Sequence, residues 1–167
     1  VGGGSVISEL NLTDNSARTT WKGPEGIHAF GNFPNFDLSK NGKLAAAVRS
    51  NYNSPPEVFV GSPGEWRELT NNNAGLQAGW GIAESIEWTN EGVNIQGWLV
   101  PPAKIEAGKK YPLVVITHGG PSSITTSQGP ASFGMARAII AAPSARGYYV
   151  PLPNPRGSDG KGEDFNR

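Results

Sequence analysis

The first half of the chain, residues 1–75, alternates short apolar runs with clusters of Gly, Pro, Asn and Ser. Each run is about five residues long, and clusters such as Ser62-Pro63-Gly64 are typical of the turns between paired strands. The pattern predicts an all-β meander built from hairpins. The expected strands are 6–12, 17–21, 43–50, 57–61 and 65–70.

A weak internal repeat runs through this half. Residues 9–12 and 17–20 (ELNL and ARTT) are echoed by 57–60 and 66–70 (EVFV and WRELT), at an offset of 48 positions from Glu9 to Glu57. A period of about 40–50 residues with several short strands per unit is typical of a β-propeller blade. Two copies alone leave an unrelated pair of hairpins as an equal alternative.

The pattern changes after residues 71–83, a polar, Gly-rich joint (NNNAGLQAGWGIA). Two further strands are expected at 85–89 and 93–100, joined by a turn at 90–92. The run 111–117 (YPLVVIT) is continuously apolar and β-branched, which predicts a strand buried on both faces of a sheet.

One convincing helix is expected, at residues 131–142 (ASFGMARAIIAA). Phe133, Arg137 and Ile140 have helical spacing, and Pro143 and Gly147 are expected to end the helix or kink its last turn. A strand at 148–152 follows. A strand, a helix and a second strand in this order form a βαβ crossover, so the second half is predicted to be α/β with a partly parallel sheet.

Composition narrows the classes of function. The chain has 14 basic and 14 acidic side chains, two histidines and no cysteine. The zero net charge argues against nucleic acid or an anionic membrane as the main partner. Without cysteine there is no disulfide or zinc–thiolate site, and we expect neither a metal nor a cofactor. No apolar stretch reaches the roughly 18 residues that a membrane span needs. Since Val1 is not a methionine and the chain stops after EDFNR, a piece of a longer protein is expected, from either the cytoplasm or the periplasm.

The most informative motif is His118-Gly119-Gly120-Pro121, directly after the apolar run 111–117. Loops at the carboxyl ends of central strands are where α/β sheets bind ligands. Two glycines leave backbone N–H groups uncovered, as an oxyanion site requires. A His-Gly-Gly loop after the third strand is the oxyanion element of α/β-hydrolases. The alternative is a plain Gly-Gly turn.

A second motif, residues 154–160 (NPRGSDG), follows the last expected strand. Arg156 could hold a substrate carbonyl or carboxylate, or it could be a structural arginine that pins its own loop.

Taken together, five motifs in order over residues 84–167 resemble the start of the catalytic domain in the prolyl oligopeptidase family of serine peptidases, in its acylaminoacyl-peptidase and dipeptidyl-peptidase-like branches. In the first half, 37–43 (DLSKNGK) and 55–58 (PPEV) resemble a late blade of that family's β-propeller. The resemblance implies a β-propeller fragment over residues 1–78, its C-terminal blades, followed by the N-terminal part of an α/β-hydrolase domain over 79–167. The five motifs are 95–102 (IQGWLVPP), 111–115 (YPLVV), 118–121 (HGGP), 146–148 (RGY) and 154–158 (NPRGS), with Gly160, Gly162 and Phe165.

In this family the nucleophilic serine lies in a Gly-x-Ser-x-Gly elbow, which the chain lacks. Ser158 has Arg156 two residues before it, and Ser62 has Val60. The resemblance implies that the elbow and the catalytic Asp and His come after Arg167, so no residue of the triad is expected in this chain.

The site residues expected within the chain are few. His118 precedes the elbow and is therefore not the triad histidine. His118, Gly119 and Gly120 match the oxyanion loop, with the Gly119 N–H as the expected donor and His118 orienting the loop. Arg156 matches an arginine in a loop that borders the substrate cleft.

The leading hypothesis is a serine-type peptidase that hydrolyses short peptides through an acyl-enzyme, of which the 167-residue fragment alone is inactive. One alternative is a non-catalytic propeller–hydrolase relative used for binding. Another is an α/β-hydrolase esterase without a true propeller. The P1 preference, the oligomeric state and the choice among dipeptidyl-, acylaminoacyl- and oligopeptidase activity remain open from the sequence.

Overall fold

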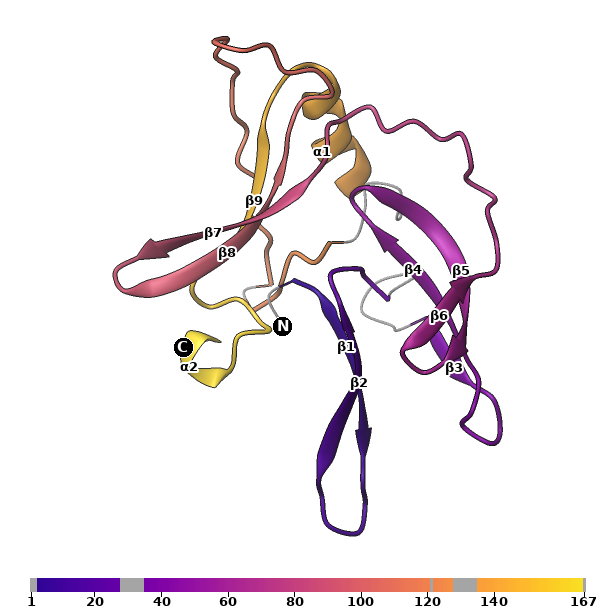
Figure 1. Ribbon diagram of the computed structural model, residues 1–167. Coiled ribbons are helices and arrows are strands. Elements are labelled where there is room, and N and C mark those ends of the chain that lie inside the picture. Colours follow the sequence, from indigo (N-terminus) through magenta and orange to yellow (C-terminus); the bar gives the residue numbers. More distant parts are fainter. Residues whose placement is uncertain (1–2, 28–34, 121, 128–134, 167) are drawn as a thin grey trace.

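The computed structural model describes residues 3–27, 35–120, 122–127 and 135–166. In this part of the chain, three antiparallel sheets and two helices are found, and β-strands dominate (Figure 1). The strands are β1 (Ser5–Leu10), β2 (Ala17–Gly23), β3 (Phe36–Leu38), β4 (Ala45–Asn51), β5 (Ser54–Ser62), β6 (Glu65–Glu68), β7 (Glu84–Asn90), β8 (Val93–Val100) and β9 (Val150–Asn154), and the helices are α1 (Met135–Ala145) and α2 (Glu163–Asn166).

The first half is all-β, as its pattern predicted. β1 and β2 form a hairpin, and β3, β4, β5 and β6 form a four-stranded meander in chain order. Each of the five expected strands is present, and β3 is an additional strand of three residues. The β5–β6 turn places Pro63 and Gly64 between the paired residues Ser62 and Glu65, and Gly64 has a φ of 97°. A proline followed by a glycine of positive φ is the preferred chemistry of a type II turn.

Aromatic side chains and one arginine hold the β1–β2 hairpin against the four-stranded sheet. The Trp66 ring of β6 meets the Trp21 ring of β2 edge-on, at 6.4 Å between centroids. The Arg49 guanidinium lies 4.3 Å from the Phe59 ring centroid and 5.3 Å from that of Trp21, and it donates to Glu25 at 2.7 Å. Stacking and ion pairing in a largely buried place make Arg49 the centre of this contact.

The second half contains the sheet β7-β8-β9, with α1 beside it (Figure 1). The β7–β8 hairpin turns through Glu91 and Gly92, whose φ values are 49° and 77°. Two successive positive φ values define the type I′ turn that suits the twist of a two-residue hairpin. Residues 111–117 run parallel to β9: Leu113 bridges Tyr149, and the N–H of Val114 donates to the Tyr149 carbonyl at 2.9 Å. With α1 between these two segments, the predicted βαβ crossover is present.

Two details of the second half differ from expectation. Residues 111–117 are not a strand buried on both faces, because Leu113 is 58% and Val115 56% exposed. β9 occupies one edge of this segment, and no described residue covers the face from which these two side chains project. The helix passes through Pro143 and ends at Ala145, three residues beyond its expected end. Gly147, with a φ of 89°, lies in the turn that follows. Residues 131–134, with Phe133, lie outside the described part of the chain.

The two halves share one hydrophobic core. Tyr52, at the tip of the β4–β5 hairpin, is buried in a cluster of second-half residues and packs on Trp98 with ring centroids 5.7 Å apart. The neighbouring Asn53 amide donates to the Ala83 carbonyl at 3.0 Å and accepts from the Ala83 N–H at 2.8 Å. The other buried members of this core are Val100, Ile140, Val150 and Leu152.

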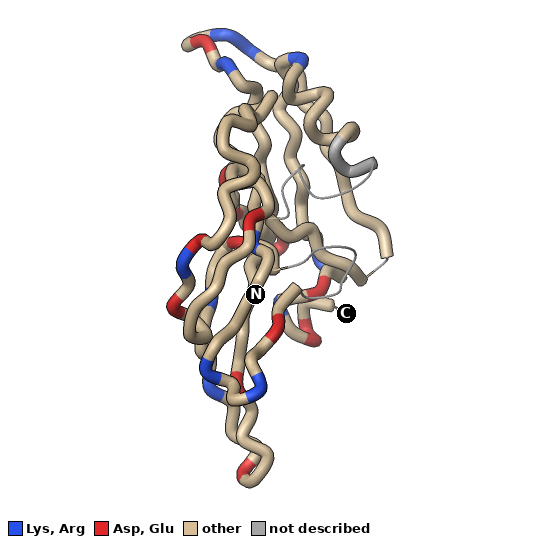
Figure 2. Tube along the Cα trace, turned by 90° about the vertical axis from the view of Figure 1, so that its right-hand side faces the viewer, with Lys and Arg blue, Asp and Glu red and all other residues tan. Residues whose placement is uncertain are grey.

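Acidic and basic residues are interspersed along the loops and hairpin ends rather than gathered into one large patch of a single sign (Figure 2). This distribution agrees with the zero formal net charge. A search of the described residues for a helix with the length and apolar character of a membrane span found none.

Candidate functional site

The two motif-bearing loops lie side by side. One loop, described over residues 118–120 and 122–127, follows the extended run 111–117, and the other, 155–162, follows β9. Because that run and β9 are parallel neighbours, both loops leave the same edge of the sheet, where α/β folds bind ligands. The Asp159 N–H donates to the Ser123 carbonyl at 2.9 Å and joins the loops directly.

His118 makes the central contact between the loops. Its Nε2 lies 2.8 Å from Ser158 Oγ, and its Nδ1 lies 3.1 Å from the Gly119 carbonyl oxygen. A carbonyl only accepts, so this geometry assigns the proton to Nδ1 and makes Nε2 the acceptor of the Ser158 hydroxyl. Ser158 has no exposed surface, whereas His118 is partly exposed.

Gly119 and Gly120 present uncovered backbone. Both are exposed, and neither N–H donates a hydrogen bond to any described residue. A Cβ added at Gly119 would meet nothing within 4 Å. Gly120 has a φ of 144°, and a Cβ there would lie 2.9 Å from Ser123 Cβ, so this position requires glycine. Because the trans peptide is planar, the Gly120 N–H points away from the Gly119 oxygen and hence away from His118.

A pair of buried side-chain amides on β8 and β9 anchors the first loop to the sheet. Asn154 and Gln96 are cross-strand partners on β9 and β8, and each is at most 2% exposed. The Asn154 Nδ2 group donates to Gln96 Oε1 at 2.8 Å and to the Thr125 carbonyl at 3.0 Å. Its Oδ1 accepts from the Thr125 N–H at 2.7 Å. This one side chain therefore fixes the middle of the 118–127 loop onto the sheet.

Arg156 lies at the periphery of this arrangement. Its guanidinium is 3.8 Å from Glu91 on the β7–β8 turn, and the two side chains are 50% and 77% exposed. An ion pair this long and this exposed contributes little to stability. Arg156 thus has no firm partner, and no hydrogen bond links it to the His118 loop among the described residues.

The sequence predicted site roles for His118, Gly119, Gly120 and Arg156 but none for Ser158 and Asn154, which contact the first loop. Both residues belong to the motif 154–158 (NPRGS), and only their presence in that motif could have indicated a role. In the described part of the chain, no carboxylate is hydrogen-bonded to His118, and no group of three or more His, Asp or Glu residues could hold a metal ion.

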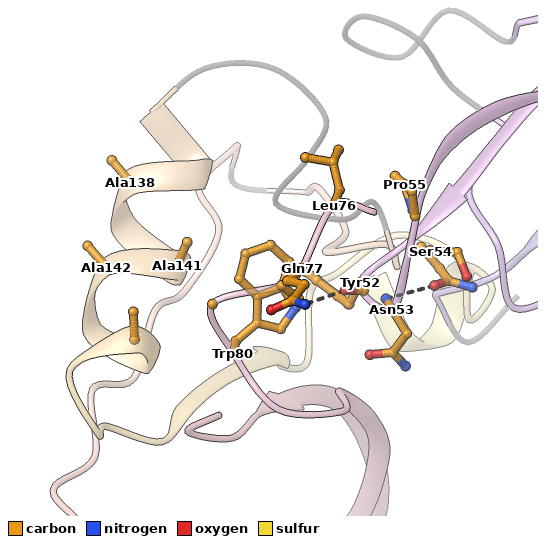
Figure 3. Close-up of a pocket in the computed structure, with 14 residues that line it drawn as sticks. Tyr52, Asn53, Ser54, Pro55, Leu76, Gln77, Trp80, Ala138, Ala141 and Ala142 are labelled. Atoms are coloured by element: carbon orange, nitrogen blue, oxygen red, sulfur yellow. Dashed lines mark hydrogen bonds between the residues drawn. The ribbon is translucent and has the colours of Figure 1, made fainter. Parts of the chain in front are cut away.

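A separate groove of about 660 Å³ lies between the β4–β5 hairpin tip, the segment 76–80 and α1 (Figure 3). It is mainly apolar, and Trp80 forms one wall with its Nε1 donating to the Tyr52 carbonyl at 2.9 Å. His118 does not line it. The α1 residues that line it, among those whose side chains the structure describes, are Ala138, Ala141, Ala142 and Ala145.

Comparison with known proteins finds peptidases among the relatives of this chain. The chain is 39% identical over 85 residues to the uncharacterized peptidase YuxL of Bacillus subtilis, which covers 50% of this chain and 12% of that protein. It is 30% identical over 135 residues to dipeptidyl-peptidase 5 of Porphyromonas gingivalis, covering 78% of this chain and 19% of that protein. The chain thus spans about an eighth to a fifth of the length of these curated relatives. No protein-family model matches it.

Solved structures agree. The Pyrococcus horikoshii acylaminoacyl peptidase matches 92% of this chain with 22% of its own, at a TM-score of 0.70 and 25% identity. A Mycobacterium tuberculosis puromycin-hydrolyzing peptidase shares the fold over 96% of this chain and 32% of its own, at a TM-score of 0.60 and 15% identity. With the motifs of both loops, these relatives place the chain in the prolyl oligopeptidase family of peptidases.

Proposed function

We propose that the chain is part of a longer serine peptidase, with the last blades of a β-propeller at residues 1–78 and the first part of an α/β-hydrolase domain at 79–167. Antiparallel hairpin-linked sheets before residue 71 and a parallel crossover after residue 111 support this division. The core around Tyr52 would then be the contact between the two domains.

The proposed reaction is the hydrolysis of short peptides through an acyl-enzyme. The nucleophilic serine and its Asp and His partners would come from the rest of the protein. This chain would contribute the oxyanion loop. The observation that carries the proposal is that the N–H groups of Gly119 and Gly120 are exposed and donate to no other described residue. The peptide geometry favours the Gly120 N–H as the donor that His118 orients, in addition to the Gly119 N–H expected from the sequence. Donors of this kind, aimed at a developing oxyanion, are each worth about 10²–10³ in kcat.

Ser158 and His118 look like a nucleophile and its base, since the hydroxyl donates to Nε2 at 2.8 Å. Two observations argue against that role. Ser158 is fully buried, so a substrate carbonyl has no route to its Oγ. The other ring nitrogen of His118 faces a backbone carbonyl rather than the carboxylate that would stabilise an imidazolium.

Arg156 is proposed as a substrate-binding residue. Its guanidinium is half exposed and only loosely paired with Glu91, so a substrate carboxylate or carbonyl can recruit it at little cost.

The test uses the full-length protein and a fluorophosphonate probe, which modifies activated serines. We expect labelling at a serine in a Gly-x-Ser-x-Gly elbow, labelling at that same serine in the Ser158→Ala variant, and none of the 167-residue fragment. An unlabelled full-length protein would favour the binding relative. Turnover of aryl esters without turnover of aminoacyl anilides would favour the esterase.

A further inference from the structure

We propose that Ser158 is a positioning residue for the oxyanion loop and acts through the imidazole of His118; this inference rests on the function proposed above. It assigns a task to a buried hydroxyl that is neither a nucleophile nor exposed to substrate. A series of contacts connects Ser158 to the Gly120 N–H.

The first link is the fixed position of the hydroxyl. The Ser158 N–H donates to the Pro155 carbonyl at 3.0 Å, and the next residue, Asp159, is bonded to Ser123. Gly160 packs so closely on Ile124 that an added Cβ would lie 2.8 Å from its Cδ1. Held on both sides and without exposed surface, Ser158 Oγ has one available acceptor in the described residues, which is Nε2 of His118.

The second link is the orientation of the ring. An imidazole held at Nε2 cannot turn about its χ2 without losing that bond, so its Nδ1–H stays directed at the Gly119 carbonyl. The carbonyl in turn sets the plane of the peptide between Gly119 and Gly120. Since that peptide is trans, its N–H is held on the side opposite His118.

The third link is the cost of losing this control. Glycines offer no Cβ to oppose rotation of the peptide that joins them, so the Gly119–Gly120 peptide can flip when its carbonyl is released. A flip would replace the N–H by a carbonyl oxygen on the side where the oxyanion forms. The transition state would be destabilised, while ground-state binding of the substrate, made elsewhere, would change little.

The test is steady-state kinetics on the full-length protein carrying Ser158→Ala. We expect kcat to fall about 10- to 100-fold with KM within about twofold, because one donor is misplaced rather than deleted. Ser158→Cys keeps a weak donor of similar size and should recover part of kcat. Ser122→Ala, an exposed serine of the same loop, is the matched control and should match wild type.

A transition-state analogue separates positioning from a general loss of structure. A peptide aldehyde should lose affinity for Ser158→Ala by the same factor as kcat, whereas a product peptide should bind as before. If the wild type is labelled by fluorophosphonate and Ser158→Ala turns over at the wild-type rate, the positioning inference fails alone. If the wild type is neither labelled nor active, the proposed function fails.

A readout independent of catalysis covers a variant that folds poorly. ¹⁵N NMR of the wild-type protein, recorded at a pH where the imidazole is neutral and with the His118 signal assigned by His118→Gln, should show the proton on Nδ1. A ring protonated at Nε2 alone would reverse the Ser158 hydrogen bond and overturn the inference.

Discussion

Asn154 offers the sharpest test of how the site is built, because a single side chain joins the sheet to the loop that carries Gly119 and Gly120. Its amide makes three hydrogen bonds of 2.7 to 3.0 Å, to Gln96 and to both backbone groups of Thr125. Asn154→Ala removes all three and leaves their partners in place.

The size of the effect follows from the burial of those partners. Gln96 is 1% exposed, and its Oε1 would lose a bond in a place that solvent does not reach, while Thr125 is only partly buried. A buried group without a partner costs about 1–3 kcal/mol, and a water molecule in the vacated space would satisfy part of the set. We therefore expect a loss of about 2–4 kcal/mol in the free energy of opening the 122–127 segment.

Hydrogen exchange measures that opening locally, at the backbone amides of the segment itself. A loss of about 2 kcal/mol or more should accelerate exchange of the Thr125 N–H at least roughly thirtyfold. The control is Asn94→Ala, where an exposed amide gives up one 3.2 Å bond to Glu87 and should change exchange in 122–127 by less than twofold. Equal exchange in the two variants would refute the reasoning.

Three further outcomes are expected. Gly120→Ala should lower kcat of the full-length protein at least tenfold, since its φ and the space around it suit only glycine; wild-type kcat would contradict the proposed oxyanion role. Asn53→Ala should lower the free energy of unfolding by about 1–3 kcal/mol in urea denaturation, because it breaks both bonds to the Ala83 backbone, and an unchanged midpoint would count against that contact as a link between the halves. The Thr70 hydroxyl donates to Glu57 and holds the pKa of that carboxyl below its ordinary value of 4.5. The charged carboxylate therefore stabilises the fold above pH 4.5, and this stabilisation is lost as the pH falls through the lower pKa of the folded state. The melting temperature of Glu57→Gln should therefore lie below that of wild type at pH 7, and the two should converge as the pH falls below 4.5. A gap that widens in acid would reverse the assigned sign.

Local chemistry explains why the hairpins could be predicted. Gly64 and Gly92 carry the positive φ values that their turns need, and each of these turns stands between runs of strand-forming residues. Turn type and strand pairing are decided within about ten residues of sequence, so the alternation of apolar and polar positions suffices.

Burial, by contrast, depends on partners that lie far away in the sequence. Residues 111–117 have the composition of an interior strand, yet Leu113 and Val115 are exposed because only β9 lies alongside them in the described chain. The composition of a segment shows whether it can be buried, whereas its actual exposure depends on the residues that pack against it. For the same reason Tyr52, in a polar hairpin tip (NYNSPP), gave no sign that it enters the core of the second half.

The contact between His118 and Ser158 follows from one register and one turn. Leu113 pairs with Tyr149 in parallel, and two parallel chains advance together, so His118, five residues on, comes level with Asn154 at the sheet edge. The chain then reverses: the Ser158 N–H closes a turn onto the Pro155 carbonyl, and Gly157 supplies the positive φ of 94° that this turn requires. The reversal brings Ser158 back to the level of His118. Both motifs can be recognised in the sequence, but neither of them determines the strand register. The pairing of residues 113 and 149 forms only when the crossover that contains α1 folds against the sheet. The spacing within the NPRGS motif thus has a physical reading: Asn154 holds one loop, Gly157 turns the chain, and Ser158 reaches the histidine of the other loop.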